Sequence, residues 1–221
     1  ANYGIVPSKT EDMIRIIDTR ISDMSFVLDN LDAIERQNPG LKGKLNQNMI
    51  IAAGHSIGTQ VVLVNTGQRI RNPMNNHITE SSEDRFMAAV MLSDPGKMAM
   101  MPENTWKGGM TPTFLSTGPK DYGLMGDGRR VAEYQNEILT LPKKSTEDKY
   151  LLLIEDGDHY FGGLIHREVD KFPDYDGLAI FNAASLAFMD AYTRDAKSAW
   201  AFLKPSVLSS ATDGRFLLTV E

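Results

Sequence analysis

The chain has 221 residues, of which 42% are hydrophobic and 24% are charged, and its formal net charge is −6. This composition is typical of one globular domain, and the scattered Lys and Arg residues predict no nucleic-acid partner. No apolar run reaches the ~18 residues that cross a bilayer, so we predict no transmembrane segment. The lack of cysteine excludes disulfides and thiol nucleophiles and leaves the localisation open.

The first predicted element is a helix over residues 8–38, where apolar side chains recur at three-to-four spacing before Pro39-Gly40 ends the pattern. Residues 48–53 (NMIIAA) follow and are predicted to form a buried strand. The segment from 59 to about 69, which is mostly apolar in its early part, then predicts a helix packed against a sheet. After it comes the polar stretch 72–84.

Later segments repeat this alternation. Residues 86–94, 112–118 and 149–154 are each strand-like and followed by a loop rich in Gly, Pro or Asp. Helices are predicted over about 127–140 and 178–203, and residues 214–221 form either a further strand or a loose tail. Strands that alternate with helices predict an α/β fold with a mostly parallel sheet flanked by helices, in a single domain over residues 1–221.

The segment Gly54-His55-Ser56-Ile57-Gly58 stands where the first strand becomes a helix. A turn this sharp gives its central residue a strained positive φ and needs small neighbours, which Gly54 and Gly58 supply. It lifts Ser56 above the carboxyl edge of the sheet, where ligands of open α/β folds bind. It also aims the Ile57 N–H at the same point, as an oxyanion donor. The pattern therefore predicts a nucleophilic serine.

A serine nucleophile requires a histidine base and an acid that orients it, and the chain has 4 histidines. In α/β hydrolases the chain order is Ser, acid, His. His159 follows the strand 150–154 in a glycine-flanked loop and fits that order, with His166 as the reserve. His77 comes before the acid, and His55 adjoins the nucleophile and points elsewhere. The predicted base is therefore His159.

The predicted acid is Asp121, just after the strand 112–118, with Asp94 as its rival and Asp127 as a weaker third candidate. An Asp after a strand is also a common turn former or helix cap. Residues near the predicted triad are assigned to a substrate pocket, although the methionines among them equally suit a core. These pocket residues are His55, Met98, Met100, Met101, Trp106, Tyr160 and Phe161.

Four segments, 20–31, 54–58, 111–121 and 150–163, resemble the α/β-hydrolase superfamily. The resemblance extends over about residues 10–200 and is closest to the dienelactone-hydrolase-like and platelet-activating-factor-acetylhydrolase-like branch. It implies a serine esterase that needs no metal or organic cofactor and acts on a small-molecule or polymeric ester through an acyl-enzyme. It also implies that the triad consists of Ser56, His159 and Asp121.

The sequence departs from this family because only one helix precedes Ser56, whereas the family places several strands there, including one whose loop gives a second oxyanion N–H. We expect either an N-terminally incomplete domain, completed by a further segment or a companion chain, or a reduced fold. Amide or peptide hydrolysis by the same triad remains open, as does a non-catalytic scaffold or processed subunit of a heteromer. No metal-ligand spacing is present that favours a metal hydrolase.

Overall fold

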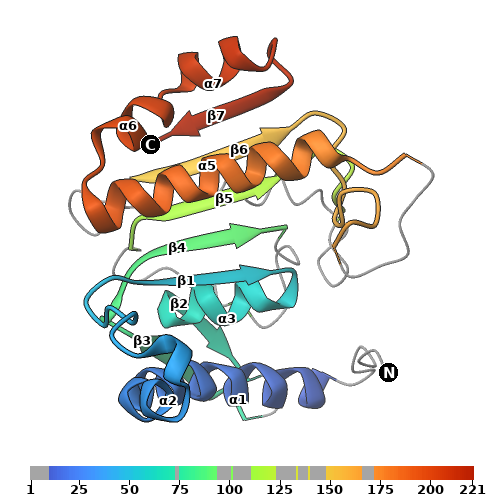
Figure 1. Cartoon of the computed structure of the whole chain (residues 1–221). Coiled ribbons are helices and arrows are strands. Elements are labelled where there is room, and N and C mark those ends of the chain that lie inside the picture. Colours follow the sequence, from blue (N-terminus) through green and yellow to red (C-terminus); the bar gives the residue numbers. More distant parts are fainter. Residues whose placement is uncertain are drawn as a thin grey trace.

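A five-stranded sheet forms the centre of the protein (Figure 1). The computed structural model describes residues 10–72, 75–93, 101, 111–122, 133, 139, 148–165 and 172–221. The first four strands of the sheet run parallel, and the fifth is antiparallel to its neighbour. In spatial order, the strands are β1 (Ile50–His55), β4 (Phe86–Leu92), β5 (Thr113–Thr117), β6 (Lys149–Ile154) and β7 (Phe216–Val220).

The sequence predicted the positions of the four parallel strands, and the structure confirms them. β7 shows that the C-terminal segment adds a strand. Consecutive residues of a strand enter opposite cores, as the two-residue period requires. Met91 and Leu115 belong to one apolar cluster, whereas Leu92 and Phe114 belong to the other. Burial on both faces explains why the central strand β4 is continuously apolar.

Helices supply the rest of each core, so the protein is an α/β structure with a mostly parallel sheet flanked by helices. One cluster includes side chains from α1 (Thr10–Asp29) and α3 (Ile57–Asn65). The opposite cluster is closed by α5 (Tyr175–Arg194), which lies along β5 and β6 in Figure 1. Two short helices, α6 (Lys197–Phe202) and α7 (Pro205–Ala211), complete that side.

The predicted long helices are interrupted. The segment 8–38 contains α1 and a separate α2 (Leu31–Gln37), followed by the 3-10 turn η1 (Pro39–Leu41), while residues 8 and 9 lie outside the described part. The break falls at Asn30, whose side-chain Nδ2 donates to the Phe26 carbonyl at 2.8 Å. This bond competes with continued helical pairing.

The C-terminal helix also begins and ends elsewhere than predicted. Asp174 caps its start by accepting from the Gly177 amide at 2.9 Å. It ends at Asp195, which adopts a left-handed conformation with φ 50° and ψ 39°. A left-handed residue ends an α-helix, so the predicted segment 178–203 divides into α5 and α6.

The prediction of a helix over 59–69 is wrong beyond Asn65. There α3 ends and β2 (Thr66–Arg71) begins, pairing antiparallel with β3 (Ile78–Ser82) in a separate two-stranded sheet. The Thr66 hydroxyl donates to the Val62 carbonyl at 3.0 Å, which satisfies an acceptor in the last helical turn. Gly67 has a φ of 121°, a conformation that glycine alone adopts readily.

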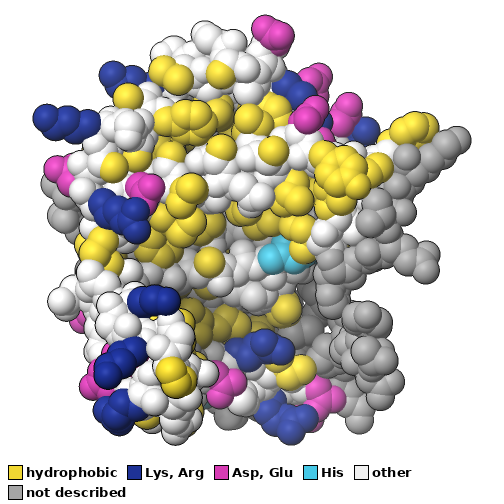
Figure 2. Space-filling model, in the orientation of Figure 1, with side chains coloured by type: hydrophobic (Ala, Val, Ile, Leu, Met, Phe, Trp, Pro, Cys, Tyr) yellow, Lys and Arg dark blue, Asp and Glu magenta, His cyan; other side chains and the backbone are white. Residues whose placement is uncertain are grey.

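The predicted helix over about 127–140 lies outside the described residues, except that Glu133 and Leu139 are helical and Leu139 is buried. None of the described helices is long and apolar enough to span a membrane. On the face shown in Figure 2, side chains of both charge signs are scattered, with apolar side chains between them.

Candidate active site

The connection between β1 and α3 is a single residue, Ser56. Its φ of 55° and ψ of −126° confirm the predicted positive φ, which costs a non-glycine residue conformational energy. The Ser56 amide donates to the Leu92 carbonyl of β4 at 3.1 Å. The Ser56 carbonyl accepts from both the amide and the hydroxyl of Thr59, at 2.9 and 2.6 Å. These bonds on both sides hold the strained turn and leave the serine hydroxyl at the carboxyl end of β1.

The two glycines around Ser56 have different roles. A Cβ on Gly54 would lie 2.5 Å from the carbonyl carbon and oxygen of Gly58 and 2.8 Å from the Thr59 nitrogen. Such contacts with backbone atoms cannot be relieved by a side-chain rotation, so Gly54 is required where strand and helix approach closely. A Cβ on Gly58 would meet no heavy atom of the described residues within 4 Å. The prediction that Gly58 must also lack a side chain is therefore wrong.

Three polar side chains from separate loops form one hydrogen-bonded series. His159 Nε2 lies 2.8 Å from Ser56 Oγ, and His159 Nδ1 lies 2.8 Å from Asp121 Oδ1. The Thr117 hydroxyl donates to Asp121 Oδ2 at 2.8 Å. The Asp121 side chain is fully buried, and His159 is 7% exposed. The predicted contacts among the three residues are present, and their catalytic roles remain predictions.

The bonding pattern assigns the imidazole tautomer. A carboxylate only accepts hydrogen bonds, so His159 Nδ1 carries the proton and, in the neutral ring, Nε2 accepts from the Ser56 hydroxyl. Burial raises the pKa of the Asp121 carboxyl, but the hydrogen bond and charge of His159, together with the Thr117 hydroxyl, outweigh it and leave the pKa below its ordinary value. Asp121 is therefore ionised at neutral pH.

Close contact between two glycines brings the acid and base loops together, which sequence analysis missed. Gly118 follows β5, and a Cβ there would lie 2.5 Å from the Cα of Gly157, which follows β6. The Lys120 amide also donates to the Gly157 carbonyl at 3.0 Å. The sequence signal for this contact was a glycine shortly after each of β5 and β6, because neighbouring parallel strands end side by side at one edge of the sheet.

The loop that carries His159 begins after β6, and its described residues 155–165 include a series of turns. Asp158 Oδ1 accepts from the amides of Tyr160 and Gly162, at 2.8 and 3.1 Å. The Tyr160 ring meets the His159 ring edge-on, with centroids 4.7 Å apart. Phe161 was assigned to the substrate pocket, but it is 2% exposed and belongs to the core beneath α5. Its positive φ of 51° reverses the chain, and this apolar ring packs in the interior.

The other predicted site residues are placed as follows. His55 lies beside His159, with ring centroids 5.0 Å apart. Met101 is buried in the core that contains α1 and α3 and accepts from Gln68 Nε2 at 3.6 Å, so it is a core residue. His77 is exposed between β2 and β3. Asp94, Met98, Met100, Trp106, Asp127 and His166 lie outside the described residues.

The predicted oxyanion donor, Ile57, is the first residue of α3. Amides in the first turn of a helix have no acceptor within the helix, and the helix dipole is positive there. The Ile57 N–H is thus a donor directly after the serine.

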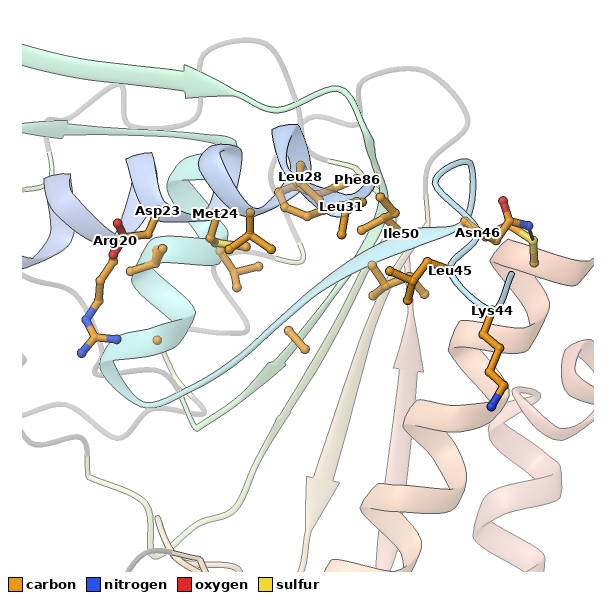
Figure 3. A pocket seen from close by; sticks show the side chains of 17 residues that line it. Arg20, Asp23, Met24, Leu28, Leu31, Lys44, Leu45, Asn46, Ile50 and Phe86 are labelled. Carbon is orange, nitrogen blue, oxygen red and sulfur yellow. Dashed lines mark hydrogen bonds between the residues drawn. The ribbon is translucent and has the colours of Figure 1, made fainter. Parts of the chain in front are cut away.

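A pocket of about 660 Å³ lies apart from these residues, along the edge of β1 (Figure 3). Its wall is mostly apolar and includes side chains of α1, β1 and α3, and its charged residues Arg20, Asp23 and Lys44 are labelled in Figure 3. Ser56, His159 and Asp121 do not line it. The described residues contain no cluster of His, Asp or Glu side chains that is arranged to hold a metal ion.

Comparison with known proteins gives matches only among solved structures. No family model and no curated protein matches the chain. The apo form of esterase 2 from Thermogutta terrifontis matches with a TM-score of 0.49 and 14% identity, over 80% of this chain and 65% of that one. A propionate-bound structure of a thermophilic esterase (Est2) from the same organism matches with a TM-score of 0.49 and 16% identity, over 79% of this chain and 63% of that one. The chain thus spans less than two thirds of the length of these structures.

Proposed function

We propose that this protein is a serine hydrolase that cleaves carboxylic esters, with Ser56 as nucleophile, His159 as general base and acid, and Asp121 as the residue that orients the base. The observation that supports this proposal is the continuous series of hydrogen bonds from Ser56 Oγ through both nitrogens of His159 to a buried, ionised carboxylate. The strained φ of Ser56 adds support, because it presents the hydroxyl at the end of a strand.

In the first half of the proposed reaction, Ser56 Oγ attacks the ester carbonyl carbon while its proton moves to His159 Nε2. The negative charge that develops on the carbonyl oxygen is stabilised by the Ile57 N–H and the start of α3. Asp121 stabilises the imidazolium through Nδ1–H. Collapse of the tetrahedral intermediate breaks the bond to the alcohol, which leaves with the proton from Nε2, and the acyl group remains on Ser56.

In the second half, a water molecule replaces the alcohol. His159 Nε2 takes a proton from the water as the water oxygen attacks the acyl carbon, and a second tetrahedral intermediate forms. Its collapse returns the proton to Ser56 Oγ and releases the carboxylic acid. No metal or organic cofactor takes part in these steps.

The α/β-hydrolase fold, its dienelactone-hydrolase-like branch and the single domain over residues 1–221 belong to the same proposal. The chain order Ser56, Asp121, His159 supports the fold assignment. The expectation of further strands next to the serine remains a prediction. It is supported by the position of β1 at the edge of the sheet and by the apolar pocket along that edge (Figure 3).

The decisive experiment is labelling of the purified chain with a fluorophosphonate, followed by peptide mass spectrometry, with hydrolysis of a p-nitrophenyl acetate substrate measured in parallel. We expect one phosphonylated residue, Ser56, and loss of both labelling and ester cleavage in Ser56→Ala. Ser210→Ala, at an exposed serine of α7, is the matched control and retains both.

Label on any residue other than Ser56 contradicts the proposal, as does undiminished ester cleavage by Ser56→Ala. His159→Ala and Asp121→Asn test the other two roles. Removal of the base reduces kcat by about 10⁴-fold or more, and replacement of the orienting Asp by Asn by a comparable factor. His166→Ala and Asp94→Asn, the rival candidates, are expected to retain activity.

A further inference from the structure

His55, the last residue of β1, forms a hydrogen bond to the backbone of the proposed base. Its Nε2 lies 2.9 Å from the carbonyl oxygen of His159. A carbonyl oxygen only accepts, so His55 Nε2 carries the proton and donates it to this bond. The contact joins residues that are 104 positions apart in the sequence. It therefore connects the strand that directly precedes Ser56 with the loop after β6.

Because His55 and Ser56 are adjacent, residue His159 is held against one short segment at two points. Its Nε2 lies 2.8 Å from Ser56 Oγ, and its backbone oxygen accepts from His55. The rings of His55 and His159 are 5.0 Å apart between centroids, and the Tyr160 ring meets both edge-on, at 5.7 and 4.7 Å. Two rings, those of His55 and Tyr160, thus pack against the base.

The loop that carries His159 needs such support. Asp156 and Phe161, on either side of His159, have positive φ values of 60° and 51°, and Gly162 and Gly163 are also left-handed. Non-glycine residues pay conformational energy in this region, and surrounding contacts must hold them there. A hydrogen bond to the His159 carbonyl fixes the backbone from which the imidazole extends.

We infer that His55 is a positioning residue, which sets the distance between the His159 imidazole and the Ser56 hydroxyl by donating to the His159 carbonyl. This inference rests on the proposed serine-hydrolase function. This role differs from the predicted one, in which His55 lines the substrate pocket, because a ring nitrogen of His55 binds the protein backbone. The group that reacts remains His159, and His55 acts only through it.

Three variants of the full chain separate the hydrogen bond from the ring. His55→Gln carries an amide nitrogen that reaches about as far as Nε2 and retains the bond. His55→Asn has the same chemistry on a shorter side chain and loses it, and His55→Phe keeps a ring without a donor. A misplacement near 1 Å costs about 100-fold in rate, so we expect Asn and Phe to reduce kcat roughly 10- to 100-fold with KM unchanged. Gln is expected to stay within about threefold of wild type. His77→Gln, at an exposed histidine, is the control.

A double-mutant cycle tests whether His55 acts through His159. We expect His55→Asn to slow fluorophosphonate labelling in the wild-type background and to have no further effect in His159→Ala. Equal slowing in both backgrounds overturns the inference, as does wild-type kcat in both His55→Asn and His55→Phe. A raised KM with unchanged kcat also overturns it, because that result assigns His55 to the substrate pocket.

Thermal melting separates this role from a purely structural one. The assays are run well below the lowest melting temperature, so a variant that loses stability alone retains its kcat. Ser56→Ala distinguishes the two proposals. If it retains ester cleavage, the hydrolase assignment fails. If it is inactive while all three His55 variants keep wild-type kcat, only the positioning role fails.

Discussion

Replacement of Gly54 by Ala tests the backbone geometry of the serine turn. The added Cβ meets the carbonyl carbon and oxygen of Gly58 at 2.5 Å and the Thr59 nitrogen at 2.8 Å. Moving the nearest of these atoms out to an ordinary contact of 3.4 Å separates β1 from the start of α3 by about 0.9 Å. Such overpacking costs about 1–3 kcal/mol, and contact with backbone atoms places this case at the upper end.

A loss of about 3 kcal/mol lowers the melting temperature of a protein of this size by roughly 6–12 °C. The same displacement acts directly on Ser56, whose hydroxyl lies 2.8 Å from His159 Nε2. We therefore expect Gly54→Ala to slow fluorophosphonate labelling by about 100-fold as well. Thermal melting followed by circular dichroism measures the first effect, and the second-order labelling rate measures the other.

Gly58→Ala is the matched control, because the same methyl group, two residues after Ser56, contacts no atom in the part of the chain that the structure describes. Ala is favoured over Gly in a helix by up to about 1 kcal/mol, so this variant is expected to be at least as stable as wild type. If Gly54→Ala melts within 2 °C of wild type, or Gly58→Ala is destabilised as much, the steric reasoning is refuted.

Three further predictions concern the loops and the pH dependence. Gly118→Ala drives the acid loop away from Gly157 and is expected to lower kcat about 10- to 100-fold; a steady-state rate equal to wild type contradicts this. Thr117→Val removes a bond that lowers the pKa of Asp121 and is expected to cost about 1.5–3 kcal/mol at pH 7. Because folding lowers the pKa of Asp121, the difference in unfolding free energy between Thr117→Val and wild type is present above the ordinary value of 3.8 and shrinks as the pH falls below it. Urea unfolding at pH 7 and at pH 3 measures this difference. An equal loss of stability at both pH values contradicts the pKa argument. The hydrogen bond from Arg85 is the main cause that lowers the pKa of Glu83 from 4.5 to about 2. Since the Arg85 side chain is 40% exposed, its ion pair with Glu83 stabilises the folded protein by about 1–2 kcal/mol. This stabilisation is present above pH 4.5 and lost towards pH 2. Glu83→Gln is expected to remove that part of the pH dependence of the unfolding free energy.

Local chemistry in the sequence was sufficient to predict the strands and the serine turn. Continuous apolar runs such as 86–92 can be buried only between two layers, so they predicted the strands of a parallel sheet. Gly54 and Ser56 between a strand and a helix predicted the positive φ. The chain order of residues with acid and base chemistry pointed to Asp121 and His159, whose predicted contact the structure contains.

Tertiary structure alone decided the features that depend on contacts between distant segments. The hairpin that begins at Thr66 is invisible to helical periodicity, because β2 follows the last residue of α3 without a loop and becomes a strand by pairing with β3. The approach of Gly118 to Gly157 and the bond from His55 to the His159 carbonyl join residues far apart in the sequence. A glycine after each strand is the local signal of the first contact, and the second leaves none, because the spacing of side chains along a chain reports which face is buried and not which distant backbone atom that face meets.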